Sequence, residues 1–245
     1  MNDNTSPVQN HHSEELLECE RPRVFALMIA FGGFLGAYTF VQKGGVFCNA
    51  QTANFVMFAV QIGTANWMKA LYYLIPISAY LLGTVISELL PKHINKFELM
   101  RWDKFFVGAE MLCVLAIGFV PDSAPPQICQ VFVNFIASMQ FNTFRQAKKI
   151  PMATTFCTNH LRQTGVHLVK WLRKRDDAAK EKFLMHALMI TSFVFGGIAS
   201  ACLCTRFFGK AIWFSEILLF IVFIDLLHAD LGCEKDKLHV VPHGH

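Results

Sequence analysis

Apolar residues gather into long runs along this chain, and polar residues concentrate in the segments between the runs. A helix needs roughly 20 apolar residues to cross a bilayer. Six runs approach that length, at about residues 24–41, 70–90, 105–120, 127–144, 183–204 and 211–231. Because a helix satisfies its own backbone hydrogen bonds in lipid, the pattern predicts an all-α integral membrane protein with six transmembrane helices.

Two segments interrupt this pattern, and the first is residues 43–62. Gly44 and Gly45 end the preceding helix, residues 46–48 favour an extended backbone, and polar side chains then fall at membrane depth: Asn49, Gln51, Thr52 and Asn54. A short apolar run follows, for which we predict Thr52 as the N-cap. Broken helices of this kind surround the substrate site in many membrane transporters.

The second interruption is residues 150–161, and Gln140 and Asn142 lead into it from the preceding run. Its polar residues are Thr154, Thr155, Thr158, Asn159 and His160. We predict a helical continuation over residues 162–175 that is too polar to cross lipid.

The overall composition agrees with a membrane domain, since 53% of the residues are hydrophobic and only 16% are charged, against about 25% charged in soluble domains. We assign residues 23–231 to one transmembrane domain, between a disordered cytoplasmic tail over residues 1–22 and a second cytoplasmic tail over residues 232–245. The first 20 residues lack the apolar stretch of a cleavable signal peptide. No basic patch with interleaved aromatic residues indicates nucleic acid as a partner.

The distribution of Lys and Arg indicates that the two interrupted segments enter the membrane and return. With six full spans and both termini in the cytoplasm, 18 of the 22 Lys and Arg residues lie on the cytoplasmic side. The remaining four are Lys43, Lys69, Arg206 and Lys210. Cytoplasmic loops are enriched in these residues, so we expect a multi-pass protein of the cell membrane in this orientation.

The same assignment divides the chain into two comparable halves, at about residues 23–120 and 127–231. Each half has three spans and one interrupted segment after its first span, so the halves have opposite orientations in the membrane. Residues 38–42 resemble residues 142–146, and residues 52–55 align with residues 158–161. Inverted repeats with paired broken helices are typical of secondary transporters, whose site lies where the breaks meet.

Several short motifs resemble a known family. Gly45-Val46-Phe47 leads to Thr52-Ala53-Asn54 in the first half, and Met139-Gln140 precedes residues 151–155 and Thr158 in the second. These motifs are similar to those of the YoaK family of bacterial membrane proteins of unknown function, over nearly the whole chain after the tail. The resemblance implies a small six-span fold in the cytoplasmic membrane and supplies no substrate.

The chain departs from the family pattern at three places. Gly36 stands before Ala37 where relatives often carry an Asp, and Ala53 and Asn159 replace two glycines of the family motifs. If that Asp is an ion-coupling carboxylate in relatives, coupling in this chain needs another acid or is absent.

Candidate site residues fall into two groups. The expected substrate-binding residues are those of the interrupted segments and their approach: Asn49, Gln51, Thr52, Asn54, Gln140, Asn142, Thr155, Thr158, Asn159 and His160. The alternative is that these side chains only form hydrogen bonds to the backbone groups that the breaks leave without partners. Glu110 and Asp225 lie within spans, where a carboxylate is costly unless paired, hydrated or protonated, and are candidates for ion coupling.

The leading hypothesis is a secondary transporter or facilitator of a small polar or anionic solute, bound between the helix N-termini near Thr52 and Thr158. The alternative is a non-transporting sensor or scaffold, whose breaks would be sealed by side chains. A weaker option is an enzyme acting on a lipid or small molecule; no nucleophile or metal cluster in the sequence supports it, so we expect no enzyme activity, metal or cofactor. The expected partners are the solute and the lipid bilayer, with a homo-oligomer left open.

Overall fold

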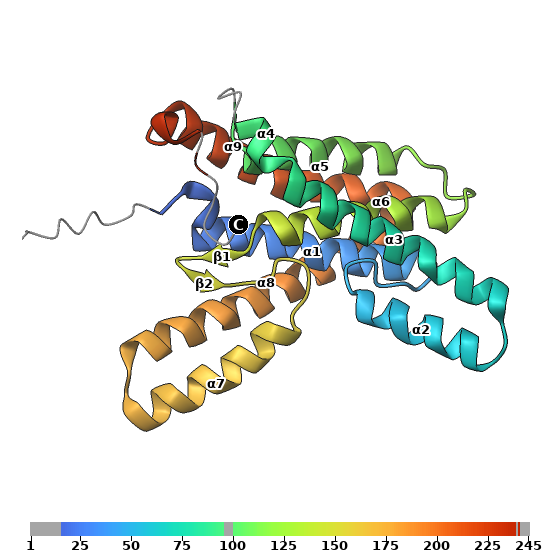
Figure 1. Cartoon of the computed structure of the whole chain (residues 1–245), viewed down its shortest axis with the longest axis horizontal. Helices are drawn as coiled ribbons and strands as arrows, with labels where there is room; N and C mark the ends of the chain where they lie inside the picture. The colour runs from blue at the N-terminus through green and yellow to red at the C-terminus, as the bar shows by residue number, and fades with distance from the viewer. Residues whose placement is uncertain (1–15, 96–99, 239, 241–245) are drawn as a thin grey trace, which may run out of the picture.

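The structure is a computed structural model that describes residues 16–95, 100–238 and 240. These residues form helices and one short antiparallel hairpin, in which β1 (Gln146–Ala147) pairs with β2 (Ile150–Pro151). Most of the helices run along one common direction, while α2 and α7 extend from the bundle toward opposite ends of the molecule (Figure 1).

The first half contains five of these helices. They are α1 (Pro22–Gln42), α2 (Gln51–Gly63), α3 (Trp67–Leu89), the short α4 (Pro91–Asn95) and α5 (Trp102–Gly118). Pro22 occupies the first turn of α1, where its missing N–H and fixed φ are favourable. At the other end of α1, Gly44 and Gly45 adopt positive φ of 86° and 69°, as predicted for the first interruption.

The second half begins with α6 (Pro126–Thr143) and the hairpin, and continues with α7 (Thr158–Lys174) and α8 (Asp177–Phe207). The 3-10 helix η2 (Phe208–Ser215) then leads to α9 (Glu216–Leu231). Two further 3-10 turns, η1 (Glu18–Glu20) and η3 (Lys235–Lys237), flank the bundle.

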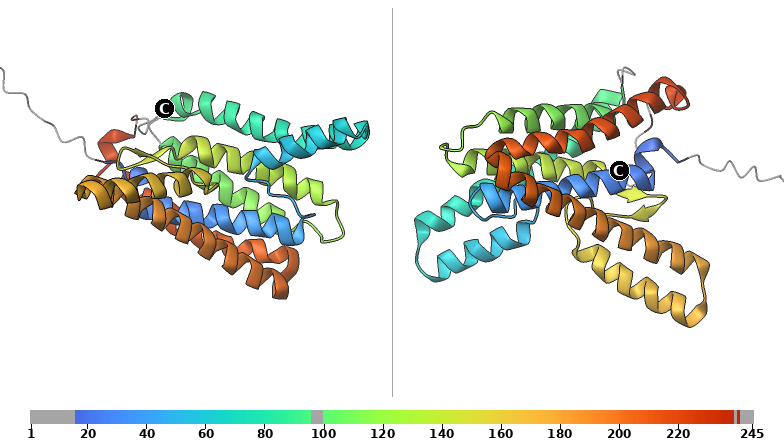
Figure 2. Two further views of the ribbon diagram at one scale, coloured as in Figure 1. Left: turned by 90° about the horizontal axis from the view of Figure 1, so that it is seen from below. Right: turned by 180° about the vertical axis from the view of Figure 1, so that it is seen from behind.

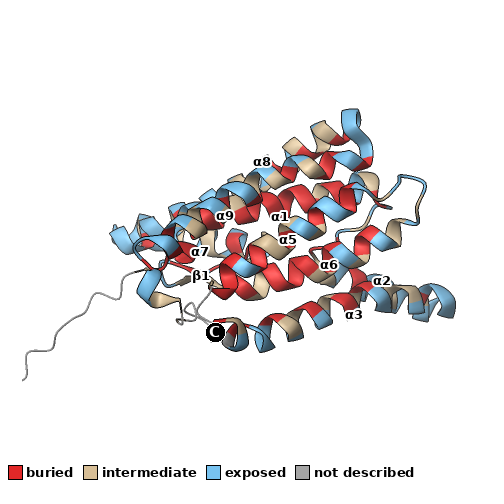
Figure 3. Cartoon of the chain, turned by 90° about the horizontal axis from the view of Figure 1, so that it is seen from above, coloured by how far each residue is buried: buried red, intermediate tan, exposed pale blue. Residues whose placement is uncertain are grey.

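Three helical stretches in the described chain are long and apolar enough to cross a membrane: Pro22–Gln42, Trp67–Asn95 and Asp177–Leu231. The first is mostly buried inside the protein, whereas about a third or less of each of the other two is buried. Figure 3 shows this arrangement, with α1 largely buried and the outer faces of α3 and α8 exposed. Exposed apolar helices of this length are suited to contact with lipid, which indicates a membrane protein.

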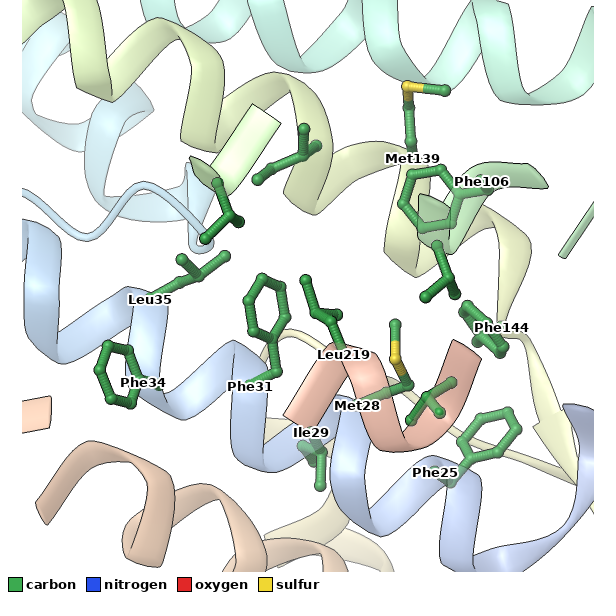
Figure 4. Close-up of a cluster of buried hydrophobic side chains, with 14 of the residues drawn as sticks. Phe25, Met28, Ile29, Phe31, Phe34, Leu35, Phe106, Met139, Phe144 and Leu219 are labelled. Atoms are coloured by element: carbon green, nitrogen blue, oxygen red, sulfur yellow. The ribbon is translucent and has the colours of Figure 1, made fainter. Parts of the chain in front are cut away.

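The hydrophobic core lies between α1, α5, α6 and α9 (Figure 4). Phe25 of α1 meets Phe144 edge to face, with ring centroids 6.1 Å apart. Met28 and Phe31 of α1 and Leu219 of α9 are also fully buried in this cluster. This packing gives α1 an unbroken set of partners along its length.

The helices pair in a regular way. Helix α1 packs against α8 and α9, and α6 packs against α3 and α5, while α2 and α7 lie along α3 and α8 respectively (Figure 2). Glycines allow the closest of these contacts, because a Cβ added at Gly33 would lie 2.0 Å from the Phe193 carbonyl oxygen and one at Gly196 would lie 1.9 Å from that of Ala30. The small residues of these two helices therefore serve helix packing.

Three details differ from the sequence prediction. The predicted last span over residues 211–231 is helical in two parts, because η2 takes up residues 208–215 and α9 begins only at Glu216. Thr52 is the second residue of α2 and is exposed, so the predicted N-cap is wrong; Ala50 occupies that position and makes no side-chain cap.

The predicted N-terminal tail is the third difference. Residues 17–20 are buried, since the Glu18 carboxylate bonds to Arg21 and Arg23 and its backbone N–H donates to the carboxylate of Glu234. The rest of that prediction, over residues 1–15, lies outside the described residues.

Candidate functional site

The two interruptions meet in the middle of the protein. The first runs over residues 43–50 between α1 and α2, and the second over residues 144–157 between α6 and α7. Because α2 and α7 leave this point toward opposite ends of the molecule (Figure 1), each interruption is approached from a different end.

Asn49 joins the two interruptions. Its side-chain amide donates to the carbonyl oxygens of Gly32 at 3.1 Å and Thr155 at 2.6 Å. Gly36 leaves the space that the Asn49 side chain fills, since an added Cβ there would come within 3.1 Å of its amide. One side chain of the first break thus satisfies main chain of both α1 and the second break.

Gln140 makes a similar connection from α6. Its amide donates to the carbonyl oxygen of Met28 at 2.9 Å and, at 3.4 Å, to that of Thr154. Gly32 allows the Thr154 carbonyl to lie against α1, because an added Cβ would be 2.4 Å from it. We call the meeting point formed by Gly32, Asn49, Gln140, Thr154 and Thr155 the crossing.

Three buried oxygen atoms at the crossing have no hydrogen-bond partner within the described part of the chain. They are the amide oxygen of Gln140 and the hydroxyls of Thr154 and Thr155, and all three residues are fully buried. A buried polar atom without a partner is destabilising by about 1–3 kcal/mol. These atoms can accept hydrogen bonds, and the hydroxyls can also donate, so they suit a small polar ligand.

Gln51 and Asn54 lie beside the crossing and bond to each other and to α6. The Gln51 amide donates to the side chain of Asn134, and Asn54 donates to Gln51 at 3.0 Å. Asn134 in turn donates to the carbonyl of Gln130 at 2.6 Å. This chain of amides attaches α2 to α6.

Of the predicted residues on α7, only His160 is buried. Its Nε2 donates to the Ala153 carbonyl at 2.8 Å, which leaves Nδ1 to accept from Nδ1 of His186 at 2.9 Å. Thr158 is exposed, and Asn159 is half-buried and accepts from Arg162 at 3.1 Å. His160 therefore holds the second break in place.

A cavity of about 360 Å³ borders the second break. Its walls include Asn142, Arg145, Ala153 and Asn159 together with Phe141 and Phe156. Asn142 also donates to the Glu88 carboxylate at 3.1 Å. Two of the predicted site residues, Asn142 and Asn159, thus face this cavity and not the crossing.

The two candidate coupling acids lie in different surroundings. Glu110 of α5 is fully buried, whereas Asp225 of α9 is partly exposed and lies 3.5 Å from Arg23. The ion pair with Arg23 gives Asp225 a structural role that requires no ion coupling.

Sequence reasoning missed a buried ion cluster at the end of the bundle that holds η1 and η3. Arg101 is fully buried, bonding to Asp103 through Nε at 2.9 Å and pairing with Glu234, while Lys104 pairs with Asp230 at 2.8 Å. Burial raises the pKa of the Glu234 carboxyl, against the opposing effect of Arg101. The cluster joins residues 101–104 to residues 230–234, and these two groups lie too far apart in sequence for spacing to have indicated it.

The structure is that of a helical protein with helices long and apolar enough to cross a membrane and with two interrupted segments in its core. The chain belongs to the family described as protein of unknown function (DUF1275), whose profile matches residues 24–224. This agrees with the expectation of an uncharacterised family, although the match does not carry the name YoaK. No curated protein and no solved structure matches the chain.

Proposed function

We propose that this protein is a secondary transporter or facilitator that moves a small polar or anionic solute across the cell membrane. The observation that carries the proposal is the crossing, where the two interrupted segments meet and three unpartnered oxygens, one from α6 and two from the second segment, are buried. Irregular backbone at membrane depth is tolerated where it is enclosed by protein or lines a polar cavity.

The helix pairing supports two inverted repeats, each with three spans and one broken segment. The contacts of α1 with α8 and α9 correspond to those of α6 with α3 and α5, and α5 packs against α9. An exchange of the two halves leaves this set of contacts unchanged, as a two-fold axis in the membrane plane requires.

The proposed orientation has both termini in the cytoplasm. Residues 16–20, the start of α5, the β-hairpin and the end of α9 lie at one end of the bundle (Figure 1). These segments and the residues beside them carry Arg21, Arg23, Arg101, Lys104, Arg145, Lys148, Lys149, Lys235 and Lys237, as expected of a cytoplasmic side. The cavity beside Arg145 and Ala153 would be the cytoplasmic approach to the crossing.

In this proposal the Asn49 amide is the contact that changes during transport. In the present state it closes the crossing by bonding to α1 and to Thr155. Rocking of one half against the other would separate the Asn49 amide from the two carbonyl oxygens. A solute would then form hydrogen bonds with these carbonyl oxygens and with the hydroxyls of Thr154 and Thr155.

A thermal-shift screen of small polar solutes against the purified full-length protein tests the proposal. A ligand at 100 times its Kd stabilises the folded state by about 2.7 kcal/mol. We expect the shift to disappear in the double variant Thr154→Val plus Thr155→Val and to persist in Thr158→Val, where the hydroxyl is exposed. A hit whose shift is unchanged in the double variant would place the solute elsewhere.

A sensor or scaffold protein is the second candidate function. The bonds of Asn49, Gln140 and His160 favour it, because they already satisfy three main-chain carbonyls of the second broken segment. Uptake of a screened solute into proteoliposomes distinguishes the two functions, since a sensor binds the solute without moving it.

A further inference from the structure

The chain holds one of its own carboxylates beside the cavity that borders the second break. Glu88 lies in the last turn of α3. Its Oε2 atom accepts a hydrogen bond from the side-chain amide of Asn142 at 3.1 Å and another from the guanidinium of Arg145. Both donor residues also line the cavity. The same two donors therefore serve an exposed carboxylate and border an internal space.

Arg145 is oriented for this contact by Asn142. Its Nε donates to the main-chain carbonyl of Asn142 at 2.8 Å, and its Nη2 donates to the side-chain oxygen of Asn142 at 2.7 Å. Because that oxygen is the acceptor, the NH₂ group of the same amide is the part that reaches the carboxylate. The guanidinium and the amide thus present donors to one carboxylate oxygen, and hydrogen bonds to a charged group are stronger than neutral ones.

The bond between Arg145 and Glu88 can be exchanged at little cost. The Glu88 side chain is 58% exposed and that of Arg145 is 26% exposed. An ion pair that is open to water contributes little to stability, because water and salt screen it. The carboxylate of a solute can therefore replace the Glu88 carboxylate on the same two donors, whereas a neutral solute gains too little from them to do so.

The remainder of the cavity suits an apolar group. Its volume of about 360 Å³ is within the range of small-molecule sites, which is about 300–1,000 Å³. The rings of Phe141 and Phe156 lie with their centroids 5.0 Å apart, and Pro151 and Met152 extend the apolar wall. A solute whose carboxylate is bound to Arg145 would place its apolar body against these side chains.

We propose that this cavity binds an organic carboxylate with an apolar or aromatic body. The solute carboxylate bonds to Arg145 and Asn142 in exchange for Glu88, which acts as an internal competitor. Ala153 lines the same cavity and precedes Thr154 of the crossing, so the bound solute lies beside the crossing. That this ligand is also the transported solute rests on the proposed function, whereas its binding does not.

Binding of benzoate to the purified full-length protein tests the site, and calorimetric titration measures it. We expect benzoate to bind more tightly than benzamide, which lacks the charge, and than acetate, which lacks the apolar body. Arg145→Gln should weaken benzoate binding at least about tenfold, because it removes a hydrogen bond between charged groups. Equal binding of benzoate and benzamide, or benzoate binding that is unchanged in Arg145→Gln, would overturn the proposal.

Glu88→Ala gives a second result that a misfolded protein cannot imitate. Removal of the internal competitor should tighten benzoate binding by about twofold to fivefold. The matched control is Glu181→Ala, which removes another exposed carboxylate that is paired with a basic side chain and should leave the affinity unchanged. An affinity in Glu88→Ala that is equal to that of the wild type, or weaker, contradicts the exchange.

These titrations measure binding without movement, so they separate this site from the transport function. Benzoate binding that depends on Arg145 supports the site even if no solute is taken up into proteoliposomes. Uptake of another solute without any binding of benzoate would overturn the carboxylate site and leave the transport function in place.

Discussion

The side-chain amide of Asn49 donates a hydrogen bond to the main-chain carbonyl of Thr155 across 106 residues of sequence, at 2.6 Å. This bond joins the interrupted segment of the first half to that of the second. It makes the crossing a structural tie as well as the proposed solute site, and the two roles predict different responses to mutation.

Removal of this tie should destabilise the protein. Asn49→Ala leaves the Thr155 carbonyl buried without its donor, and we expect a loss of about 1–3 kcal/mol in the free energy of unfolding. Thermal unfolding in detergent measures it. The control is Asn159→Ala, whose amide bonds to the exposed Arg162 and should change stability by less than about 0.5 kcal/mol.

Removal of the unpartnered hydroxyls should leave the free energy of unfolding unchanged or raise it. Thr154→Val and Thr155→Val delete buried oxygens that have no protein partner, so the ligand-free variants should be as stable as the wild type or more stable, by up to about 1–3 kcal/mol. A clear loss of stability in both variants would indicate that the hydroxyls support the fold and are not kept for a ligand.

The contact between α1 and α8 should not tolerate a methyl group. Gly33→Ala and Gly196→Ala each place a Cβ within about 2 Å of a carbonyl oxygen of the facing helix, so we expect a loss of at least about 1–3 kcal/mol. Gly165→Ala, on the exposed part of α7 with open space around it, should instead stabilise its helix by up to about 1 kcal/mol. Unfolding temperatures of the three variants test the contrast.

The buried ion cluster should depend on Arg101. Arg101→Ala leaves Asp103 and Glu234 buried without their cation, and breaking a buried pair in this way destabilises by about 3–5 kcal/mol. The exposed pair of Lys148 and Glu181 is the comparison, because Glu181→Ala should cost less than about 1 kcal/mol. Equal effects of the two variants would contradict the assigned burial.

The pH dependence of stability should carry a contribution from Glu234. Burial raises the pKa of this carboxyl in the folded protein above its ordinary value of about 4.3. Its contribution to stability is therefore complete below that ordinary value and is lost as the pH rises through the folded pKa. The wild type should gain stability relative to Glu234→Gln as the pH falls toward about 4.3, and unfolding temperatures over a pH series measure the difference.

The helical class and the positions of the interruptions could be predicted from sequence because their causes are local. The two glycines after residue 43 end α1 wherever it packs, and an apolar run of sufficient length favours a helix in lipid. The end of α8 and the 3-10 turn at residues 208–215 were not predictable in this way. They depend on Phe208 at a φ of 51° and on the Tyr38 hydroxyl, which donates to the Gly209 carbonyl from α1.

The type of residue at the site could be predicted from the sequence, but the partner of each residue could not. Polar residues at membrane depth marked Asn49, Gln140 and Thr155, and the structure brings these three together at the crossing. The same criterion also selected Thr52 and Thr158, which are exposed, because residue type does not specify which face of a helix is covered.

The sequence by itself determined that this chain forms apolar helices with two breaks, since hydrophobic runs and glycine conformations act over a few residues. Only the tertiary structure decided that the breaks touch, that Asn49 joins them, and that Glu110 is fully buried while Asp225 pairs with Arg23. These pairings depend on how distant helices pack, and packing is set by the whole chain at once.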